Sequence, residues 1–339
     1  MTNNHEPPFP SVLSSLFGDD DVPIHLLFRL SDMEPNEFAQ FRAAWTGVDE
    51  ERRAALVRHM AEIAEENYLV DFTPVFAHLF GDEHASVRQG ALDGVWDCTE
   101  PQLIRPIIDL LQNDRSVAVR AAAARALAHY VLLAEWGQIA PDLATPIVDA
   151  LLAEYDRPRA SLEIKRAALE AVASANHPRV AELIRDAYED GPEELQLSAL
   201  FAMGLSADQQ WLPILRQEMD SPAADFRAEA ARAAGAIGSS EALDDLERLV
   251  SDEDLDVATA AVYALGQIGS EQAAELLTRL SEDPDYEELY DAIDEALEEM
   301  DWMGGEFDLL AFPDAPDEDE EEDEDQDEDD DLLLNLRAN

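Results

Sequence analysis

Two stretches of the chain decide its fold: FRAEAARAAGAIG, Phe226–Gly238, and VATAAVYALGQIG, Val257–Gly269. They share an apolar first residue, several alanines and a closing G-x-I-G. The same pattern begins again at Val87, Val119, Ile164, Leu195 and Leu289. The distance between successive starts is nearly constant, except for one longer step, from Val119 to Ile164. A period of roughly 30 residues indicates that one structural unit is stacked many times along the chain.

Each unit is predicted to contain a helix whose small residues face a neighbouring helix. The residues four positions after the start of the unit are Ala91, Ala123, Ala168, Ala199, Ala230, Ala261 and Ile293, and the residues eight positions after it are also apolar. Spacings of four and eight fall on one face of an α-helix. The roughly 20 residues between units carry bulkier apolar groups and predict a second helix, and Pro106, Pro146 and Pro213 are expected to kink it.

Paired helices with an Ala-rich second member, a V-R start and a G-x-I-G end resemble HEAT repeats. The resemblance covers about residues 35–299 and includes a degenerate first pair. It implies an all-α, right-handed α-solenoid of about eight HEAT-like helix pairs whose second helices line a concave groove. We predict a flexible N-terminal arm at 1–23, a solenoid at 24–303 with an insertion at 129–163, and a disordered acidic tail at 304–339 that ends in an apolar segment.

The insertion coincides with the one part of the chain that is not acidic. Residues 101–185 contain ten basic and ten acidic residues, whereas the rest of the chain is strongly acidic. The candidate partner-binding residues here are Trp136, Tyr155, Arg157, Arg159, Lys165 and Arg166. One interpretation is a docking site for an acidic peptide or for the chain's own tail.

The alternative is structural and follows from the resemblance. In HEAT repeats the basic group of the V-R position pairs with an aspartate in the turn of a neighbouring repeat. Arg88, Arg120 and Arg227 hold that position, Lys165 holds its equivalent, and Asp82, Asp114 and Asp225 are expected to be the acidic partners.

The tail contains the run DEDEEEDEDQDEDDD at 317–331, in which every residue but one is acidic. Such a run repels itself and is expected to stay extended. Apolar residues flank it, and we predict as tail anchors Phe307, Leu309, Leu310, Phe312, Leu332, Leu333 and Leu334. The alternative is that the tail only solubilises the protein.

The overall charge limits the possible partners. The 339 residues carry a formal net charge of −55, which disfavours binding to nucleic acid or anionic lipid and favours basic proteins. We expect a protein partner, no nucleic acid and no membrane. No signal peptide or apolar run of membrane-spanning length is recognised in the sequence, so a cytoplasmic location is expected. The sequence leaves the oligomeric state and the partner's identity open.

No catalytic residue, metal ligand or cofactor is predicted. The iron-dependent deoxyhypusine hydroxylases, which are HEAT-like, carry repeated His-Glu dyads, and here the one such pair is His5-Glu6. The lone Cys98 has no basic neighbour in sequence. We therefore predict a non-catalytic interaction scaffold or adaptor that binds through its groove and tail. The alternatives are an enzyme or assembly factor of the bilin-lyase type, favoured by a deep aromatic pocket around Trp96, Tyr130 and Trp136, and a structural subunit of a larger assembly.

Overall fold

The computed structural model describes residues 7–18, 20–67 and 69–310. These residues form α-helices joined by turns and short 3₁₀ segments, and no strand occurs among them. The helices are α1 (Phe9–Leu16), α2 (Ile24–Leu27), α3 (Pro35–Trp45), α4 (Glu50–Glu66), α5 (Thr73–Leu79), α6 (Ala85–Asp93), α7 (Ile104–Asn113), α8 (Val117–Glu135), α9 (Pro141–Tyr155), α10 (Leu162–Val172), α11 (Pro178–Asp190), α12 (Glu193–Leu205), α13 (Leu212–Glu218), α14 (Ala224–Ile237), α15 (Leu243–Leu249), α16 (Leu255–Ile268), α17 (Glu271–Ser281) and α18 (Tyr290–Leu310).

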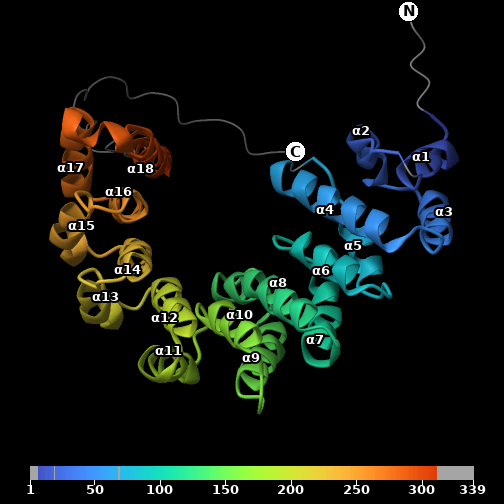
Figure 1. Ribbon diagram of the computed structural model, residues 1–339, viewed down its shortest axis with the longest axis horizontal. Helices are drawn as coiled ribbons and strands as arrows, with labels where there is room; N and C mark the ends of the chain where they lie inside the picture. The colour runs from blue at the N-terminus through green and yellow to red at the C-terminus, as the bar shows by residue number, and fades with distance from the viewer. Residues whose placement is uncertain (1–6, 19, 68, 311–339) are drawn as a thin grey trace, which may run out of the picture.

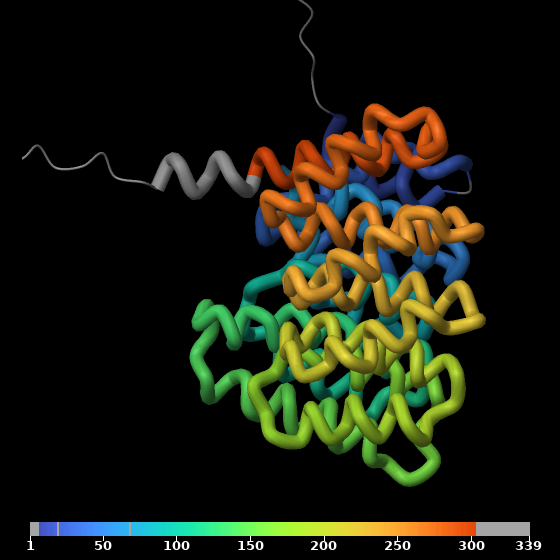
Figure 2. Tube along the Cα trace, turned by 90° about the vertical axis from the view of Figure 1, so that its left-hand side faces the viewer, coloured from blue at the N-terminus to red at the C-terminus, as the bar shows by residue number. Residues whose placement is uncertain are grey.

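The helices from α3 onward form eight consecutive pairs that follow an open ring (Figure 1). From α7 to α18 the odd-numbered member of each pair lies on the outside of the ring, and the even-numbered member lies on the inside. Figure 2 shows the same pairs stacked one above another along the path of the chain. The all-α, right-handed solenoid of eight HEAT-like pairs is thus confirmed.

The predicted packing face is the core of this stack. The residues at the centre of that face, six alanines and one isoleucine, have no solvent exposure in all seven units: Ala91, Ala123, Ala168, Ala199, Ala230, Ala261 and Ile293. They lie where one inner helix meets its neighbours, so that each helix buries its apolar stripe against the repeat before and the repeat after it. One contiguous apolar core therefore runs from α1 to α18.

The helix ends follow local sequence signals. Gly238 and Gly269 terminate α14 and α16 in the left-handed conformation, with φ of 73° and 63°, as expected for a glycine that ends a helix. Ser270 accepts a hydrogen bond from the backbone N–H of Ala273 and caps α17. These glycines define the G-x-I-G turns of the repeat.

The prolines differ from the prediction. Pro106 and Pro213 do not interrupt a helix, because each lies in the first turn of an α-helix that directly follows a 3₁₀ turn. Proline is tolerated there because the N–H groups of the first turn have no helical partner. Pro146 does lie inside its helix, α9.

The insertion consists of two long helices. The inner helix α8 has 19 residues and ends just before Trp136, and the outer helix α9 has 15 residues, against seven in α13 and in α15. A loop follows α9 and leads to α10 at Leu162. The long step in the repeat is thus accommodated by the extra length of α8 in one pair, the extra length of α9 in the next pair, and this loop.

The N-terminal segment is not a flexible arm where the structure describes it. Residues Phe9, Val12, Leu13 and Leu16 of α1 are at most 5% exposed and pack into the core. The Arg52 guanidinium of α4 donates hydrogen bonds of 2.6 and 2.5 Å to the carbonyl oxygens of Leu16 and Asp20. The contact with Leu16 stabilises the carbonyl end of α1, and the contact with Asp20 holds the segment that follows it, so this helix covers the first pair of the solenoid.

The C-terminal boundary also differs from the prediction. The last helix, α18, continues to Leu310, so the first seven residues of the predicted tail are helical. Phe307, Leu309 and Leu310 lie in this helix, whereas Phe312, Leu332, Leu333, Leu334 and the acidic run lie outside the described residues.

One described helix, α8, is long and apolar enough to cross a membrane by length and composition, although the sequence predicts no such run. Of its most apolar window, 56% is buried inside the fold. It packs against α6, α7, α9 and α10, so its apolar character is explained by its place in the core.

Candidate functional site

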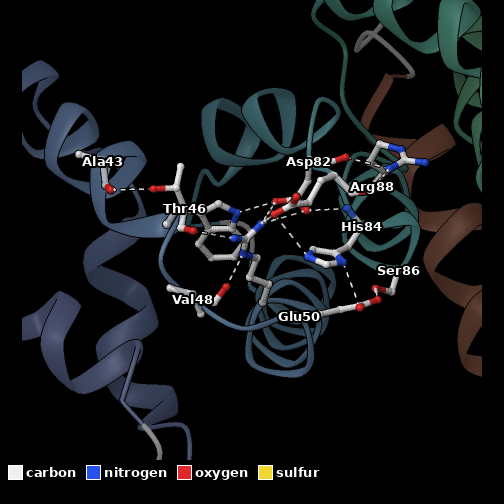
Figure 3. A network of polar contacts seen from close by, with 11 residues as sticks. Ala43, Thr46, Val48, Glu50, Asp82, His84, Ser86 and Arg88 are labelled. Atoms are coloured by element: carbon white, nitrogen blue, oxygen red, sulfur yellow. Dashed lines mark hydrogen bonds and ion pairs between the residues drawn. The ribbon is translucent and has the colours of Figure 1, made fainter.

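A ladder of arginine side chains joins successive repeats at the turns between paired helices. Arg53 of α4 is 4% exposed and donates to both carboxylate oxygens of Asp82, in the turn before α6, at 3.1 and 3.3 Å (Figure 3). The indole N–H of Trp45 donates to the same carboxylate at 2.7 Å. The Arg53 guanidinium also donates to the backbone carbonyls of Thr46 and Val48. The exposed carboxylate of Glu83 accepts a further hydrogen bond from Arg53 at 3.3 Å, so the buried guanidinium has both charged and neutral acceptors, as a stable buried ion pair requires.

The V-R arginines form the next steps of the ladder. Arg88 donates two hydrogen bonds to Asp114, at 2.7 and 2.9 Å, and Arg120 pairs with Glu154, which is 1% exposed. Further along the chain, Arg227 binds Asp252 at 2.8 and 2.7 Å. The predicted structural role of these three arginines is confirmed.

Two of the predicted acidic partners need correction. Asp82 pairs with Arg53, and its side chain is not the partner of Arg88, which donates instead to its backbone carbonyl. The prediction of Asp225 is wrong, because the partner of Arg227 lies in the following turn, at Asp252. On α4, α6, α8 and α14 the ladder thus runs from an inner helix to the next repeat.

Lys165 does not continue the ladder. Its ammonium nitrogen lies 5.2 Å from the centroid of the Tyr155 ring, a cation–π contact, and no salt bridge joins it to an acid of the described chain. Nearby, Arg157 pairs with Glu154 at 2.6 Å and donates to the Gln112 carbonyl at 3.1 Å. Tyr155, Arg157 and Lys165 therefore cluster at one end of α9 and are largely engaged with the fold.

The remaining predicted residues lie elsewhere. Trp136 is 61% exposed at the end of α8, before α9 begins, whereas Tyr155 ends that 15-residue helix. A helix of this length separates the two by about 20 Å. Arg159 is exposed with a φ of 68° in the loop after α9. Arg166 lies on the inner helix α10 and donates to the Ser198 hydroxyl at 2.8 Å. The structure does not bring these residues together into one site.

A hollow lies instead on the surface of the inner helices α12, α14 and α16. Two adjoining cavities of about 380 and 560 Å³ share Phe201, Glu229 and Arg232 in their walls. Phe201, Leu205 and Tyr263 are 41%, 43% and 37% exposed. We call this region the inner groove. It also contains the following residues: Arg166, Glu170, Ser198, Gly204, Asp225, Ala233, Ala236, Asp254, Asp256, Ala260, Ala264 and Gln267.

Some charged side chains of the inner groove have a partner within the groove, and others have no ion pair. Glu229 is half-buried, and its burial raises the pKa of its carboxyl group above the usual value, although Arg232, 3.2 Å away, acts in the opposite direction. Asp254 accepts the backbone N–H of Asp256 and caps α16. No salt bridge within the described chain reaches Asp225 or Asp256. This end of the groove therefore presents uncompensated negative charge.

The aromatic residues named for the lyase alternative do not form a shared pocket. Tyr130 is fully buried, and its hydroxyl donates to the Glu100 carbonyl at 3.1 Å, whereas Trp96 and Trp136 are 46% and 61% exposed. Among the described residues no ring contact joins the three. They are thus one core residue and two separate surface residues.

The two remaining possibilities for catalysis are the thiol of Cys98 and a metal site, and the described residues support neither. Cys98 is 8% exposed, and burial raises the pKa of its thiol to about 12, so it is protonated at neutral pH. Within residues 7–18, 20–67 and 69–310, no group of three His, Cys, Asp or Glu side chains could hold a metal ion.

The sequence does contain an indication of the inner groove, although its charge pattern points to the insertion instead. The seventh residue of every unit is exposed or half-buried on an inner helix: Asp93, Arg125, Glu170, Phe201, Arg232, Tyr263 and Glu295. In most units this residue is charged, but on α12 and α16, the two neighbours of α14, it is aromatic. An aromatic side chain at an otherwise charged surface position indicates a contact surface.

Comparison with known proteins supports the repeat assignment. A family model of HEAT repeats matches residues 212–298, which span α13 to α18. No curated protein matches the chain in sequence.

Solved structures of low identity are similar to the chain. Human deoxyhypusine hydroxylase in complex with glycerol is 17% identical, covers 87% of this chain and 96% of its own, and has a TM-score of 0.33. The CpcE–CpcF complex of phycocyanin lyase from Nostoc sp. PCC7120 is 16% identical, with 67% and 94% covered and a TM-score of 0.46. An engineered protein is 18% identical, with 86% and 88% covered and a TM-score of 0.38. TM-scores below 0.5 carry no information about activity. The repeat-family match shows that the last three pairs are HEAT repeats, and the same arrangement of paired helices is present from α3 onward.

Proposed function

We propose that this chain is a non-catalytic scaffold or adaptor that binds a protein partner through its inner groove. The observation that carries the proposal is the exposure of Phe201, Leu205 and Tyr263 in one hollow of the inner helices. Isolated exposed apolar residues are ordinary, but a contiguous hollowed patch rimmed by polar groups is typical of a binding surface.

The composition of the groove favours binding over chemistry. Its wall consists of alanine, aromatic and carboxylate side chains, and its arginines are already engaged, Arg232 with Glu229 and Arg166 with Ser198. Two groups of the groove have a raised pKa: burial raises the pKa of the Glu229 carboxyl group, and the hydrogen bond that Tyr263 donates to Glu295 raises the pKa of its hydroxyl group. Aromatic anchors inside a polar rim are the usual composition of a protein interface.

The acidic tail is the second contact element of the proposal. It follows α18, which packs on α16 beside the inner groove. Its acidic run at 317–331 carries the charge that attracts a basic partner, and its attachment to α18 brings that partner close to the groove. Weak groove contacts joined to electrostatic capture would give avidity without a large interface.

The test is a capture experiment from host lysate with four forms of the protein. These are the full chain, a truncation after Leu310, the double variant Phe201→Ala/Tyr263→Ala, and Trp136→Ala as a matched exposed aromatic outside the groove. We expect one set of partners to be lost with the double variant and retained with Trp136→Ala. Partners lost only at high salt and only with the truncation would assign binding to the tail. Capture that is equal for all four forms would contradict the groove proposal.

A further inference from the structure

Resting on the proposed function, we infer the chemistry of the partner: the inner groove takes a basic amphipathic protein segment. An apolar side chain of that segment lies between Phe201 and Tyr263, and a lysine or arginine lies at the acidic end formed by Asp225 and Asp256. The inference follows from the shape, the free charges and the spacing of these two parts of the groove.

The apolar part of the groove is a flat floor between two aromatic walls. Ala233 and Ala236 of α14 form the floor, and Phe201 of α12 and Tyr263 of α16 stand on either side. The floor is flat because the inner helices touch there without intervening side chains: a Cβ added at Gly204 would lie 2.8 Å from the Ala233 Cα. A leucine, methionine or phenylalanine from a partner fits a slot of this kind, because it can bury its side chain without displacing a polar group.

The acidic part adjoins it at the N-terminal ends of α14 and α16. Arg166 and Arg232 are each held by groups of the groove itself, and Asp254 is occupied as a helix cap. Asp225 and Asp256 remain without an ion pair in the described chain. Because the groove's own cations are engaged, an incoming lysine or arginine is the group that can satisfy these carboxylates.

Charge also decides among the possible occupants. The tail of this chain and a second copy of it carry the same negative sign as the acidic end, since the chain has a net charge of −55. Either one would bring like charges together, which costs free energy in a partly desolvated groove. A basic segment of another protein is the occupant that the field of this molecule attracts.

The spacing gives the pattern that the segment must carry. Asp225 and Ala233 are separated by about two helical turns of α14, which corresponds to about 12 Å along a helix axis. A bound helix spans this distance in about two turns, so its cation and its apolar residue stand about seven positions apart on one face. An extended segment spans it in about four residues.

The experiment measures binding of labelled synthetic peptides to the full chain by fluorescence anisotropy. The probe is a helical Ala/Gln-based peptide with two arginines about one heptad from two leucines on the same face. One matched peptide has glutamate in place of arginine, and another has alanine in place of leucine. Both chain directions are tested. The alanine peptide reports capture by the acidic tail, because it keeps the charge and lacks the apolar anchor.

We expect the probe to bind at least about tenfold more tightly than either matched peptide. Phe201→Ala and Tyr263→Ala should each weaken the probe about tenfold, and Asp225→Asn/Asp256→Asn should weaken it roughly threefold and reduce its salt dependence. Leu69→Ala, at an exposed apolar site outside the groove, should leave binding unchanged. Thermal unfolding of each variant checks that it is folded.

Two results would overturn the inference. Equal binding of the probe and the glutamate peptide would show that the acidic end does not select a positively charged segment. Equal binding by the full chain and by both aromatic variants would show that the probe sits elsewhere. If lysate partners still depend on Phe201 and Tyr263 while the probe fails, the scaffold proposal stands and the basic chemistry of the partner is wrong. If neither depends on these residues, both fail.

Discussion

Between α4 and α9 four successive repeats are joined by three arginines that each reach a carboxylate in the next repeat, whereas between α12 and α18 the inner helices touch through glycine and alanine. In the first region Arg53, Arg88 and Arg120 pair with Asp82, Asp114 and Glu154. In the second region a Cβ added at Gly235 would lie 2.6 Å from the Ala264 Cα. The first half is therefore joined by polar contacts at its turns, whereas the second half has one such step, from Arg227 to Asp252, and is held in addition by close helix packing.

This difference explains where the inner groove forms. Gly204, Gly235 and Gly266 hold the same position in three successive units, and a Cβ there would lie within 3 Å of the next inner helix. The equivalent residues upstream are Trp96, Ala128 and Ala173, none of which is a glycine. Close contact brings the seventh-position side chains of α12, α14 and α16 within reach of one partner segment, so the groove depends on these glycines.

The largest expected effect is the loss of a ladder step. Replacing Asp82 with alanine leaves the buried Arg53 guanidinium and the Trp45 indole N–H without their shared acceptor. Breaking a buried ion pair by removing one partner costs about 3–5 kcal/mol. We expect amide hydrogen exchange in α3–α6 to accelerate strongly while exchange in α14–α18 stays unchanged, because each repeat contacts only its neighbours.

The control for this prediction is an exposed ion pair. Asp220 and Arg248 form a 2.9 Å pair with side chains 69% and 47% exposed. Asp220→Ala should cost no more than about 1 kcal/mol. Equal effects of the two substitutions would mean that the ladder contributes no more than ordinary surface charge.

The second effect concerns the glycine contacts. Gly235→Ala places a methyl group 2.6 Å from backbone that cannot rotate away. Overpacking of this kind costs about 1–3 kcal/mol and is offset in part by the better helix propensity of alanine, so we expect a net loss of about 1–2 kcal/mol. Hydrogen exchange should now accelerate in α14 and α16 and stay unchanged in α3–α6. Gly47→Ala, where the nearest atom would be 3.6 Å away, should have little effect. Unchanged exchange in α16 would show that the helices separate without cost.

The repeat itself is predictable because its signals are local. The spacing of apolar and small residues places every inner helix, and the V-R pattern identifies three arginines of the ladder. The pairing of Arg227 with Asp252 instead of Asp225 is not predictable from spacing alone, because both aspartates lie beside turns and only the stacking of repeats selects one. Predictions that need the relation between repeats are therefore weaker than predictions within a repeat.

Two features differ most from the prediction: the packed N-terminal helix and the position of the inner groove. The prolines of the N-terminal segment suggest an arm, yet Pro8 and Pro10 stand at the start of α1, where proline is tolerated, and its apolar residues follow a helical spacing. The inner groove escapes prediction because the charge pattern points to the insertion instead. Tyr155, Arg157 and Lys165 of the insertion are engaged with the fold, whereas aromatic side chains of α12 and α16 are exposed at equivalent positions of their repeats.

The smallest effect would come from adding a second ladder step, after Arg227–Asp252, to the glycine-packed half. The separation in sequence between Ala258 and Asp283 equals that between Arg227 and Asp252. The Asp283 carboxylate accepts the N–H of Asp285 at 3.1 Å, just as Asp252 accepts the N–H of Asp254 at 3.0 Å. Asp283 is thus a ladder acid held in place opposite an alanine. We expect Ala258→Arg to form this missing pair and to stabilise the fold by about 1 kcal/mol, since a charge-assisted hydrogen bond is offset by the ordering of the arginine.

The gain should depend on the ionised carboxylate. At the existing step, the hydrogen bonds from Arg227 hold the pKa of Asp252 below its usual value of 3.8. A carboxyl group whose pKa is lowered in the folded state stabilises the fold above its unfolded pKa and loses that contribution as the pH falls through the lowered value. Urea unfolding of Ala258→Arg at pH 7 and pH 5 should therefore show the same gain, and the Asp283→Asn background should abolish it at both. A gain that survives Asp283→Asn would come from the arginine's other contacts, and a loss of stability would mean that the closely packed half has no room for a ladder side chain.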